Sequence, residues 1–154
     1  MHRRAFLATA AASGLLAACG GKPPPPGPAT VAITVTGAPG MNPGPDGGDR
    51  PVTLSLLRLK DAGVFSTADM FALLGDPTTA LGADLIGMDQ LVIAPGGKAA
   101  KTMTFEPEAT QLGLIASLRD PSGKVWRTAM PVAPNQAATA SVTLGPKGIE
   151  LKLA

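Results

Sequence analysis

Over most of its length the chain places apolar and polar residues alternately in short segments. The first segment shows the pattern clearly, because Val31, Ile33 and Val35 alternate with Ala32 and Thr34. Such alternation is typical of half-buried strands in antiparallel sheets. Four later segments repeat it, and three others are apolar runs bounded by Gly or Pro. We therefore predict about eight strands, at residues 31–35, 52–59, 85–93, 99–105, 112–118, 126–132, 140–144 and 149–153.

Tight turns join several of these segments. Residues 120–123, Asp-Pro-Ser-Gly, suit a type I turn, and residues 145–148 repeat that chemistry. Short strands joined in this way predict a mainly β protein, a two-sheet antiparallel sandwich. Successive strand residues face opposite sides, so we expect Trp126 in the core with Met130 and Val132, and Arg127 outside it.

One segment departs from the strand pattern and predicts a short helical insertion at residues 65–75. Ser66 is a suitable N-cap, and Asp69 stands three residues later. Four apolar side chains would lie on one side and pack on the sheets, namely Met70, Phe71, Leu73 and Leu74. A second helical turn is predicted at Asp76-Pro77, with Asp as the cap and Pro at the first helical position.

Residues 37–50 follow neither pattern. They contain five glycines and three prolines, and Met41 is their only large apolar residue. Loops of this length are uncommon in compact domains and are usually functional or disordered. From these residues alone, an idle surface loop and a functional loop both remain open.

The N-terminus has the pattern of an export signal. Basic residues at positions 2–4 precede an uncharged apolar run, residues 6–18, which is too short to span a bilayer. The run ends in Leu16-Ala17-Ala18-Cys19, which resembles the lipobox of bacterial lipoproteins; the alternative is an ordinary signal peptide with an unrelated cysteine. Arg3 and Arg4 also resemble a twin-arginine motif, which leaves the export route open.

We therefore predict three regions: a signal peptide at 1–18, a lipidated Cys19 with a Pro-rich linker at 19–29, and a sandwich domain at 30–154. The linker after Cys19 consists only of Gly, Lys, Pro and Ala. Such a segment favours an extended polyproline conformation, which would hold the domain roughly 30 Å from its anchor.

The composition of the mature chain argues against an enzyme. Of 13 Lys and Arg residues, Arg3 and Arg4 lie in the signal peptide, which leaves 11 against 11 Asp and Glu. No basic field remains to attract nucleic acid. The only histidine, His2, is also removed, and the chain has no tyrosine. Histidine-based catalysis and zinc binding are therefore disfavoured. We expect no metal, no small-molecule substrate and no cofactor other than lipid on Cys19.

Taken together, these features resemble the TssJ family, also called SciN or VasD, the outer-membrane lipoproteins of type VI secretion systems. The resemblance runs through the whole mature chain. It rests on the order and spacing of Cys19 and the segments 42–43, 51–59, 65–73, 81–85, 89–96, 112–116 and 126–127. It implies a transthyretin-like sandwich with a small helical addition.

The resemblance also implies a partner. In this family the lipoprotein binds the periplasmic C-terminal region of the inner-membrane protein TssM, with TssL in the same complex. The loop between the first two strands contributes to that contact, and it corresponds to residues 37–50. The residues expected to touch the partner are Met41 and Asn42, with Pro43, Asp46, Asp49 and Arg50 around them.

Gly20 follows the cysteine, rather than the aspartate associated with inner-membrane retention. We therefore expect an outer-membrane anchor, several acyl chains on Cys19, and a domain that faces the periplasm. The alternative is a periplasm-facing lipoprotein of another β-sandwich class that acts as a ligand-binding module. Hydrolases of transthyretin-like fold are a third possibility, but they depend on histidines that the mature chain lacks.

Overall fold

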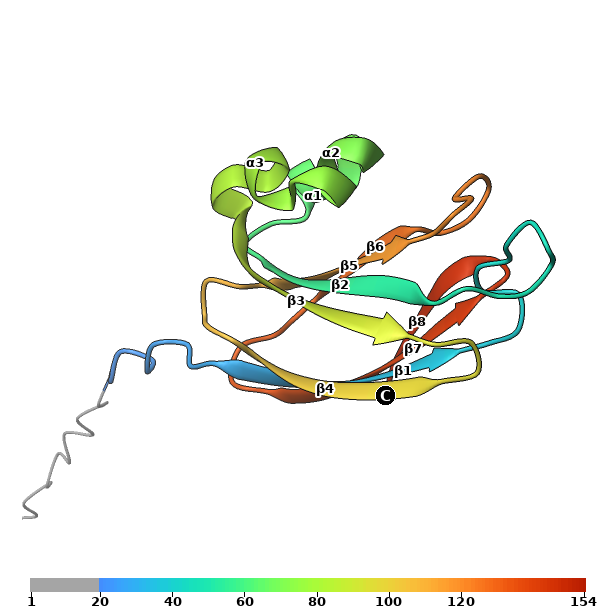
Figure 1. Cartoon of the computed structure of the whole chain (residues 1–154). Helices are drawn as coiled ribbons and strands as arrows, with labels where there is room; N and C mark the ends of the chain where they lie inside the picture. The colour runs from blue at the N-terminus through green and yellow to red at the C-terminus, as the bar shows by residue number, and fades with distance from the viewer. Residues whose placement is uncertain (1–19) are drawn as a thin grey trace, which may run out of the picture.

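The computed structural model describes residues 20–154, so the predicted signal peptide and Cys19 lie outside the described residues. Two four-stranded sheets pack face to face, as predicted (Figure 1). One sheet has the order β4-β1-β7-β8 and the other β3-β2-β5-β6. The strands are β1 Ala29–Gly37, β2 Val52–Leu59, β3 Leu85–Ile93, β4 Lys98–Phe105, β5 Gln111–Ser117, β6 Arg127–Pro131, β7 Ala137–Gly145 and β8 Gly148–Leu153.

All eight predicted strands are present, with ends shifted by a few residues. The pairing is antiparallel except between β1 and β7, which run parallel from Thr30↔Ala137 to Gly37↔Leu144. This parallel pair departs from the purely antiparallel prediction. It arises because β1 lies between β4 and β7, strands that follow it much later in the chain. Both pairings of β1 therefore join segments far apart in the sequence, whereas β7 and β8 form a local hairpin.

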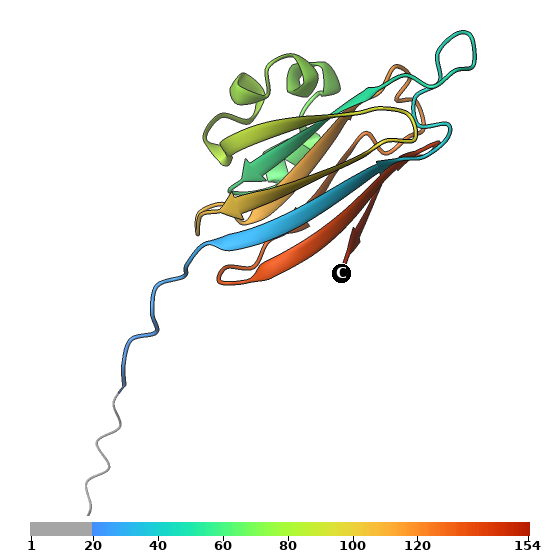
Figure 2. The same ribbon diagram turned by 60° about the horizontal axis from the view of Figure 1, so that its bottom comes forward.

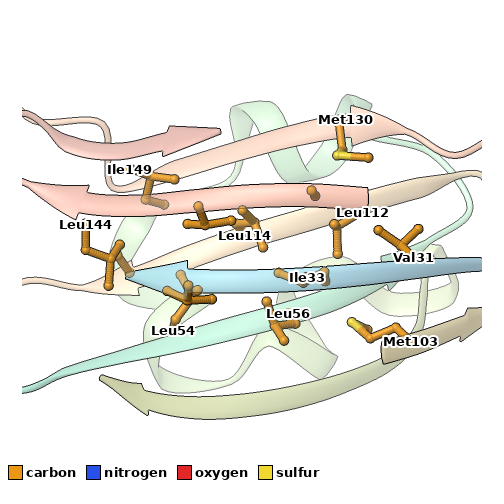
Figure 3. Close-up of a cluster of buried hydrophobic side chains, with 14 of the residues drawn as sticks. Val31, Ile33, Leu54, Leu56, Met103, Leu112, Leu114, Met130, Leu144 and Ile149 are labelled. Carbon is orange, nitrogen blue, oxygen red and sulfur yellow. The ribbon is translucent and has the colours of Figure 1, made fainter. Parts of the chain in front are cut away.

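The core lies between the sheets and is built from alternate strand residues. Val31, Ile33 and Val35 of β1 are at most 1% exposed. Val31 and Ile33 lie with Leu54 and Leu56 of β2 in the core between the sheets (Figure 3). Full burial of a side chain of this size contributes about 1.5–3 kcal/mol. The apolar and polar residues thus alternate in the sequence because each strand buries one of its two faces.

Between β2 and β3, three short helices cover the outer face of the β3-β2-β5-β6 sheet (Figure 1). They are α1 Gly63–Thr67, α2 Met70–Gly75 and α3 Pro77–Leu81, followed by the 3-10 turn Gly82–Asp84. The prediction of one helix over residues 65–75 is therefore wrong. Ala68 is extended, with ψ 149°, and separates α1 from α2.

The break follows from the cap chemistry. Asp69 accepts hydrogen bonds from the amides of Phe71 and Ala72 at 3.0 and 3.1 Å and so begins a new helix. Ser66 is no cap, because its hydroxyl donates to the Ala62 carbonyl at 2.6 Å. The predicted start at Asp76 is confirmed: its side chain accepts from the Thr79 amide, and Pro77 occupies the first turn.

The insertion rests on a second apolar cluster. Leu57, Leu59 and Ile115 project from the outer face of the sheet and meet three buried side chains of the helices, Phe65, Leu73 and Leu81. Of the four residues predicted to pack, only Leu73 is buried. The predicted packing of Phe71 and Leu74 is wrong, since these side chains are 76% and 38% exposed.

Trp126 differs from its predicted position. It precedes β6, is half-buried, and packs on this second cluster rather than between the sheets with Met130 and Val132. Arg127 lies outside the inter-sheet core, as predicted. Its guanidinium lies 4.6 Å from the centroid of the Trp126 ring and donates to the carbonyls of Phe65 and Ala68 at 3.0 and 2.6 Å. Arg127 thereby fixes the insertion to the sheet.

Candidate partner-binding surface

The β1–β2 loop lies at the end of the sandwich opposite to the N-terminal segment (Figures 1 and 2). The N-terminal segment enters β1 at Ala29, and β1 ends at Gly37, so the strand is nine residues long. At about 3.3 Å per residue, the strand separates the two ends by roughly 30 Å. The predicted functional loop therefore points away from the side on which an N-terminal anchor would hold the domain.

Met41, predicted as a partner contact, is part of the core in this structure. Its side chain is 0% exposed and belongs to the inter-sheet cluster with Val35, Ile93 and Leu144. An apolar side chain in a loop of glycines and prolines reduces its contact with water by entering the core. Met41 therefore anchors the loop to the sandwich, and its contact with a partner stays a prediction.

Asn42 is also buried, at 5% exposure, and its amide links three chain segments. Its Oδ1 accepts from the Arg119 amide at 2.9 Å, and its Nδ2 donates to the Pro51 carbonyl at 3.2 Å. The Asn42 carbonyl accepts from the Arg50 amide at 2.8 Å. Like that of Met41, the side chain of Asn42 is committed to holding the loop, and its contact with a partner stays a prediction.

Asp49 fastens the loop from its other side. Its carboxylate accepts from the amides of Gly40 at 2.8 Å and Asn42 at 3.2 Å. Asp49 and Pro43 also form an isolated antiparallel bridge. Half-buried Asp49 thus closes the base of the loop, while Pro43 is exposed.

Beyond this bridge, residues 43–48 form a compact exposed tip. The Gly44 amide donates to the Gly48 carbonyl at 2.8 Å, and the Gly47 amide donates back to the Gly44 carbonyl at 3.0 Å. Arg50 contacts both carboxylate oxygens of Asp46, at 2.9 and 3.0 Å. The Arg50 guanidinium, with the Gly48 amide, lowers the pKa of Asp46. Of the six predicted contact residues, Pro43, Asp46 and Arg50 are exposed.

Two further segments lie beside this loop. The Ala38 amide donates to the Leu144 carbonyl at 2.7 Å, next to the β7–β8 turn. Arg119, whose amide donates to Asn42, lies in the β5–β6 connection. That connection is joined in turn to the β7–β8 turn, since the Val125 amide donates to the Lys147 carbonyl at 2.9 Å. Sequence reasoning missed these neighbours because they stand some 77 and more positions from the loop.

The linker is attached to the opposite end. The Gly27 amide donates to Asn135 Oδ1 at 2.6 Å, and the Asn135 amide donates back to the Gly27 carbonyl at 3.2 Å. Asn135 adopts the left-handed conformation, φ 59°, which Asn tolerates better than most residues. The paired hydrogen bonds hold the end of the linker to the β6–β7 connection, and the linker extends from this end of the sandwich (Figure 2).

Within residues 20–154 there is no group of His, Cys, Asp and Glu side chains placed to hold a metal ion. The same residues form no pocket. None of their helices has the length and apolar character needed to cross a bilayer.

The architecture is that of a β-sandwich with a braced loop at the end opposite to the N-terminal segment. A family model described as "Type VI secretion lipoprotein, VasD, EvfM, TssJ, VC_A0113" matches residues 29–147. The chain therefore belongs to the TssJ (SciN/VasD) family of type VI secretion lipoproteins, and the predicted resemblance is confirmed. The family is one of structural secretion components and is not a known enzyme family.

Solved structures agree with this assignment. The T6SS lipoprotein TssJ1 from Pseudomonas aeruginosa is 31% identical with a TM-score of 0.78, and the match covers 82% of this chain and 97% of that one. Serratia marcescens Lip, described as a membrane bound component of the type VI secretion system, is 22% identical with a TM-score of 0.74, covering 80% and 96%.

A third similar fold is a chain in the structure of the T6SS protein TssM C-terminal domain (869-1107) from EAEC. It is 23% identical with a TM-score of 0.65, and the match covers 80% of this chain and 97% of that one. No curated protein sequence matches the chain.

Proposed function

We propose that the protein is an outer-membrane lipoprotein that anchors the envelope complex of a type VI secretion system, through binding of the periplasmic C-terminal region of TssM, with TssL in the same complex. The observation that carries the proposal is the exposed tip of residues 43–48, braced at the end of the sandwich far from the linker. The shared fold with a chain in the TssM C-terminal domain structure supports this choice of partner.

The tether places the tip well away from a membrane. From Cys19 to the Gly27 contact with Asn135, an extended Pro-rich segment would span roughly 25 Å. Strand β1 adds roughly 30 Å in a direction leading away from the linker. The tip would then stand on the order of 50 Å from the acylated cysteine, which suits a contact with a protein that approaches from the inner membrane.

The fixed conformation of the tip also suits binding. Its base is held by Met41, Asn42 and Asp49, and its turn by the Gly44 and Gly48 hydrogen bond. A loop already ordered in the free protein loses less conformational entropy when a partner docks. Residues 20–154 contain equal numbers of acidic and basic residues and no histidine. We therefore infer recognition by local shape and hydrogen bonding, and a structural rather than catalytic role.

Replacement of residues 43–48 by a Gly-Ser segment of equal length is expected to weaken TssM binding at least tenfold, about 1.4 kcal/mol. The substitution removes the Pro43 and Asp46 side chains and the turn, but leaves Met41 and Asn42 in the core. The measurement is calorimetric titration of the TssM periplasmic region with the soluble form that starts at Gly20.

The matched control replaces residues 106–108, an exposed turn after β4, by Gly-Ser-Gly. This control is expected to bind TssM with unchanged affinity. An unchanged dissociation constant for the 43–48 variant, with thermal unfolding also unchanged, would show that the tip is idle and that the contact lies elsewhere on the sandwich.

Cys19→Ser is expected to release the protein from the membrane. A single acyl chain holds a protein only marginally, whereas several chains on one cysteine hold it firmly, since each buried CH₂ adds about 0.8 kcal/mol. Without the thiol no chain can be attached. Fractionation with metabolic lipid labelling tests this, and the Gly20→Ala variant serves as the control that keeps the label. A Cys19→Ser protein that is still processed and sediments with outer membrane would refute the lipid anchor.

A further inference from the structure

The helical insertion exposes apolar side chains on the surface that faces away from the sheet. Phe71 is 76%, Val64 44% and Leu74 38% exposed. Phe71 and Leu74 are three residues apart on α2, so they lie on the same face of that helix. Exposed apolar groups that cluster on one element are typical of interaction sites.

The exposure of Phe71 is fixed by the packing beneath it. Leu73 points from the opposite side of α2 into the second cluster and is 2% exposed. A rotation of α2 that buried Phe71 would expose Leu73. The Asp69 cap and the Arg127 contacts with the Phe65 and Ala68 carbonyls hold the helices in place. The apolar face is therefore a permanent feature of the folded domain.

The charged residues of the insertion itself all have one sign, and the cation beside it, Arg127, is engaged by the Phe65 and Ala68 carbonyls. Residues 61–84 contain four aspartates and no lysine or arginine, although residues 20–154 as a whole are neutral. Asp69 lies beside Phe71, whose amide donates to its carboxylate at 3.0 Å. At the other end of α2, Asp76 accepts from the Thr79 amide and hydroxyl, and these bonds lower the pKa of Asp76. Asp69 and Asp76 thus lie at the two ends of α2, at the margins of the apolar face.

We infer that this face docks a basic amphipathic segment of another protein, one that places an apolar side chain against Phe71 and Leu74 and lysines or arginines against Asp69 and Asp76. The charge pattern selects a protein over a lipid surface. Helices that lie on membranes carry Lys and Arg around their apolar face, because bilayer surfaces are commonly anionic. Carboxylates at these positions would be repelled by such a surface and attracted by a basic protein segment.

The surface is separate from the loop tip. Strand β2 begins at Val52 after the loop and ends at Leu59 before α1, so its length of eight residues lies between the two surfaces. At about 3.3 Å per residue this is roughly 26 Å. A partner at the tip would therefore leave the helical face accessible, and the protein could hold two partners at once.

The test uses nitrogen-15-labelled protein from Gly20 to Ala154 and a synthetic amphipathic helical peptide of leucine and lysine. Peptide-induced amide shifts are expected to concentrate in α1 and α2. Phe71→Ser should weaken binding at least about tenfold. Asp69→Asn keeps the helix cap, so it should lower affinity and reduce its salt dependence without loss of folding. The matched control is Val92→Ser, which removes an exposed apolar side chain from β3 and should leave binding unchanged.

Three results would overturn the inference. The first is equal binding of a peptide with glutamate in place of lysine. The second is a shift map centred outside the insertion or unaffected by Phe71→Ser. The third is Phe71-dependent binding to phosphatidylglycerol vesicles stronger than binding to the peptide, which would assign the face to lipid.

Discussion

Met41→Ala is expected to destabilise the domain by about 2–5 kcal/mol, the usual cost of truncating a fully buried methionine. The side chain is 0% exposed and contacts the ends of both sheets at the base of the loop. Its removal leaves a cavity where the loop joins the core. Urea unfolding of the form that starts at Gly20 measures the change in the free energy of unfolding.

Met88→Ala is the matched control, because Met88 is 38% exposed on the outer face of β3. The same atoms are removed, but little of the cost of cavity formation applies, so the change should stay below about 1 kcal/mol. Equal effects of the two substitutions would contradict the placement of Met41 in the core. An unchanged stability of Met41→Ala with lost TssM binding would restore Met41 as a direct contact.

The comparison matters for the proposed function because it distinguishes residues that hold the loop in place from residues that would touch the partner. Met41, Asn42 and Asp49 form the base of the loop, whereas residues 43–48 form its exposed tip. A substitution in the base is expected to weaken partner binding indirectly, together with stability. A substitution in the tip is expected to weaken binding alone. Only the second behaviour identifies a contact.

The strands could be predicted from the sequence because each carries a local signal. Val31, Ile33 and Val35 alternate with exposed residues, and one buried face per strand follows directly from the period of two. The start of α3 at Asp76-Pro77 was equally readable, since the cap and the proline act on their own backbone. Strand alternation and helix caps involve residues close together in the chain, so they can be recognised without knowledge of the fold.

The base of the loop could not be predicted in this way. Met41 is the only large apolar residue in a segment rich in Gly and Pro, a pattern that suits an exposed side chain and a buried one equally well. Met41 is buried because it joins the core between the sheets. Asn42 is held by a hydrogen bond from the amide of Arg119, which lies far along the chain. The break at Ala68 was missed for a different reason: two suitable caps, Ser66 and Asp69, stood close together, and Asp69 became the cap of a new helix.

A contact between distant segments also explains why a substitution at Gly148 is expected to destabilise the domain strongly. This residue begins β8 with φ +92°, and a Cβ atom there would overlap the carbonyl oxygen of Val125. The two residues form a parallel bridge that ties the β5–β6 connection to the β7–β8 turn, and the Val125 carbonyl accepts from the Ile149 amide at 2.7 Å. Because backbone lies on both sides of the contact, neither partner can move aside by a change of rotamer.

Gly148→Ala is therefore expected to cost more than 3 kcal/mol, about 1–2 of which comes from the left-handed conformation and the rest from the displaced Val125 backbone. Gly123→Ala is the matched control: its φ is +68°, but a Cβ atom there meets nothing within 4 Å, so only the conformational part applies. Thermal and urea unfolding of both variants measure the difference. Equal destabilisation by Gly148→Ala and Gly123→Ala would mean that the contact with the Val125 backbone adds nothing to the cost. The β5–β6 connection and the β7–β8 turn would then be held together by the Asn42 side chain and the turn hydrogen bonds alone.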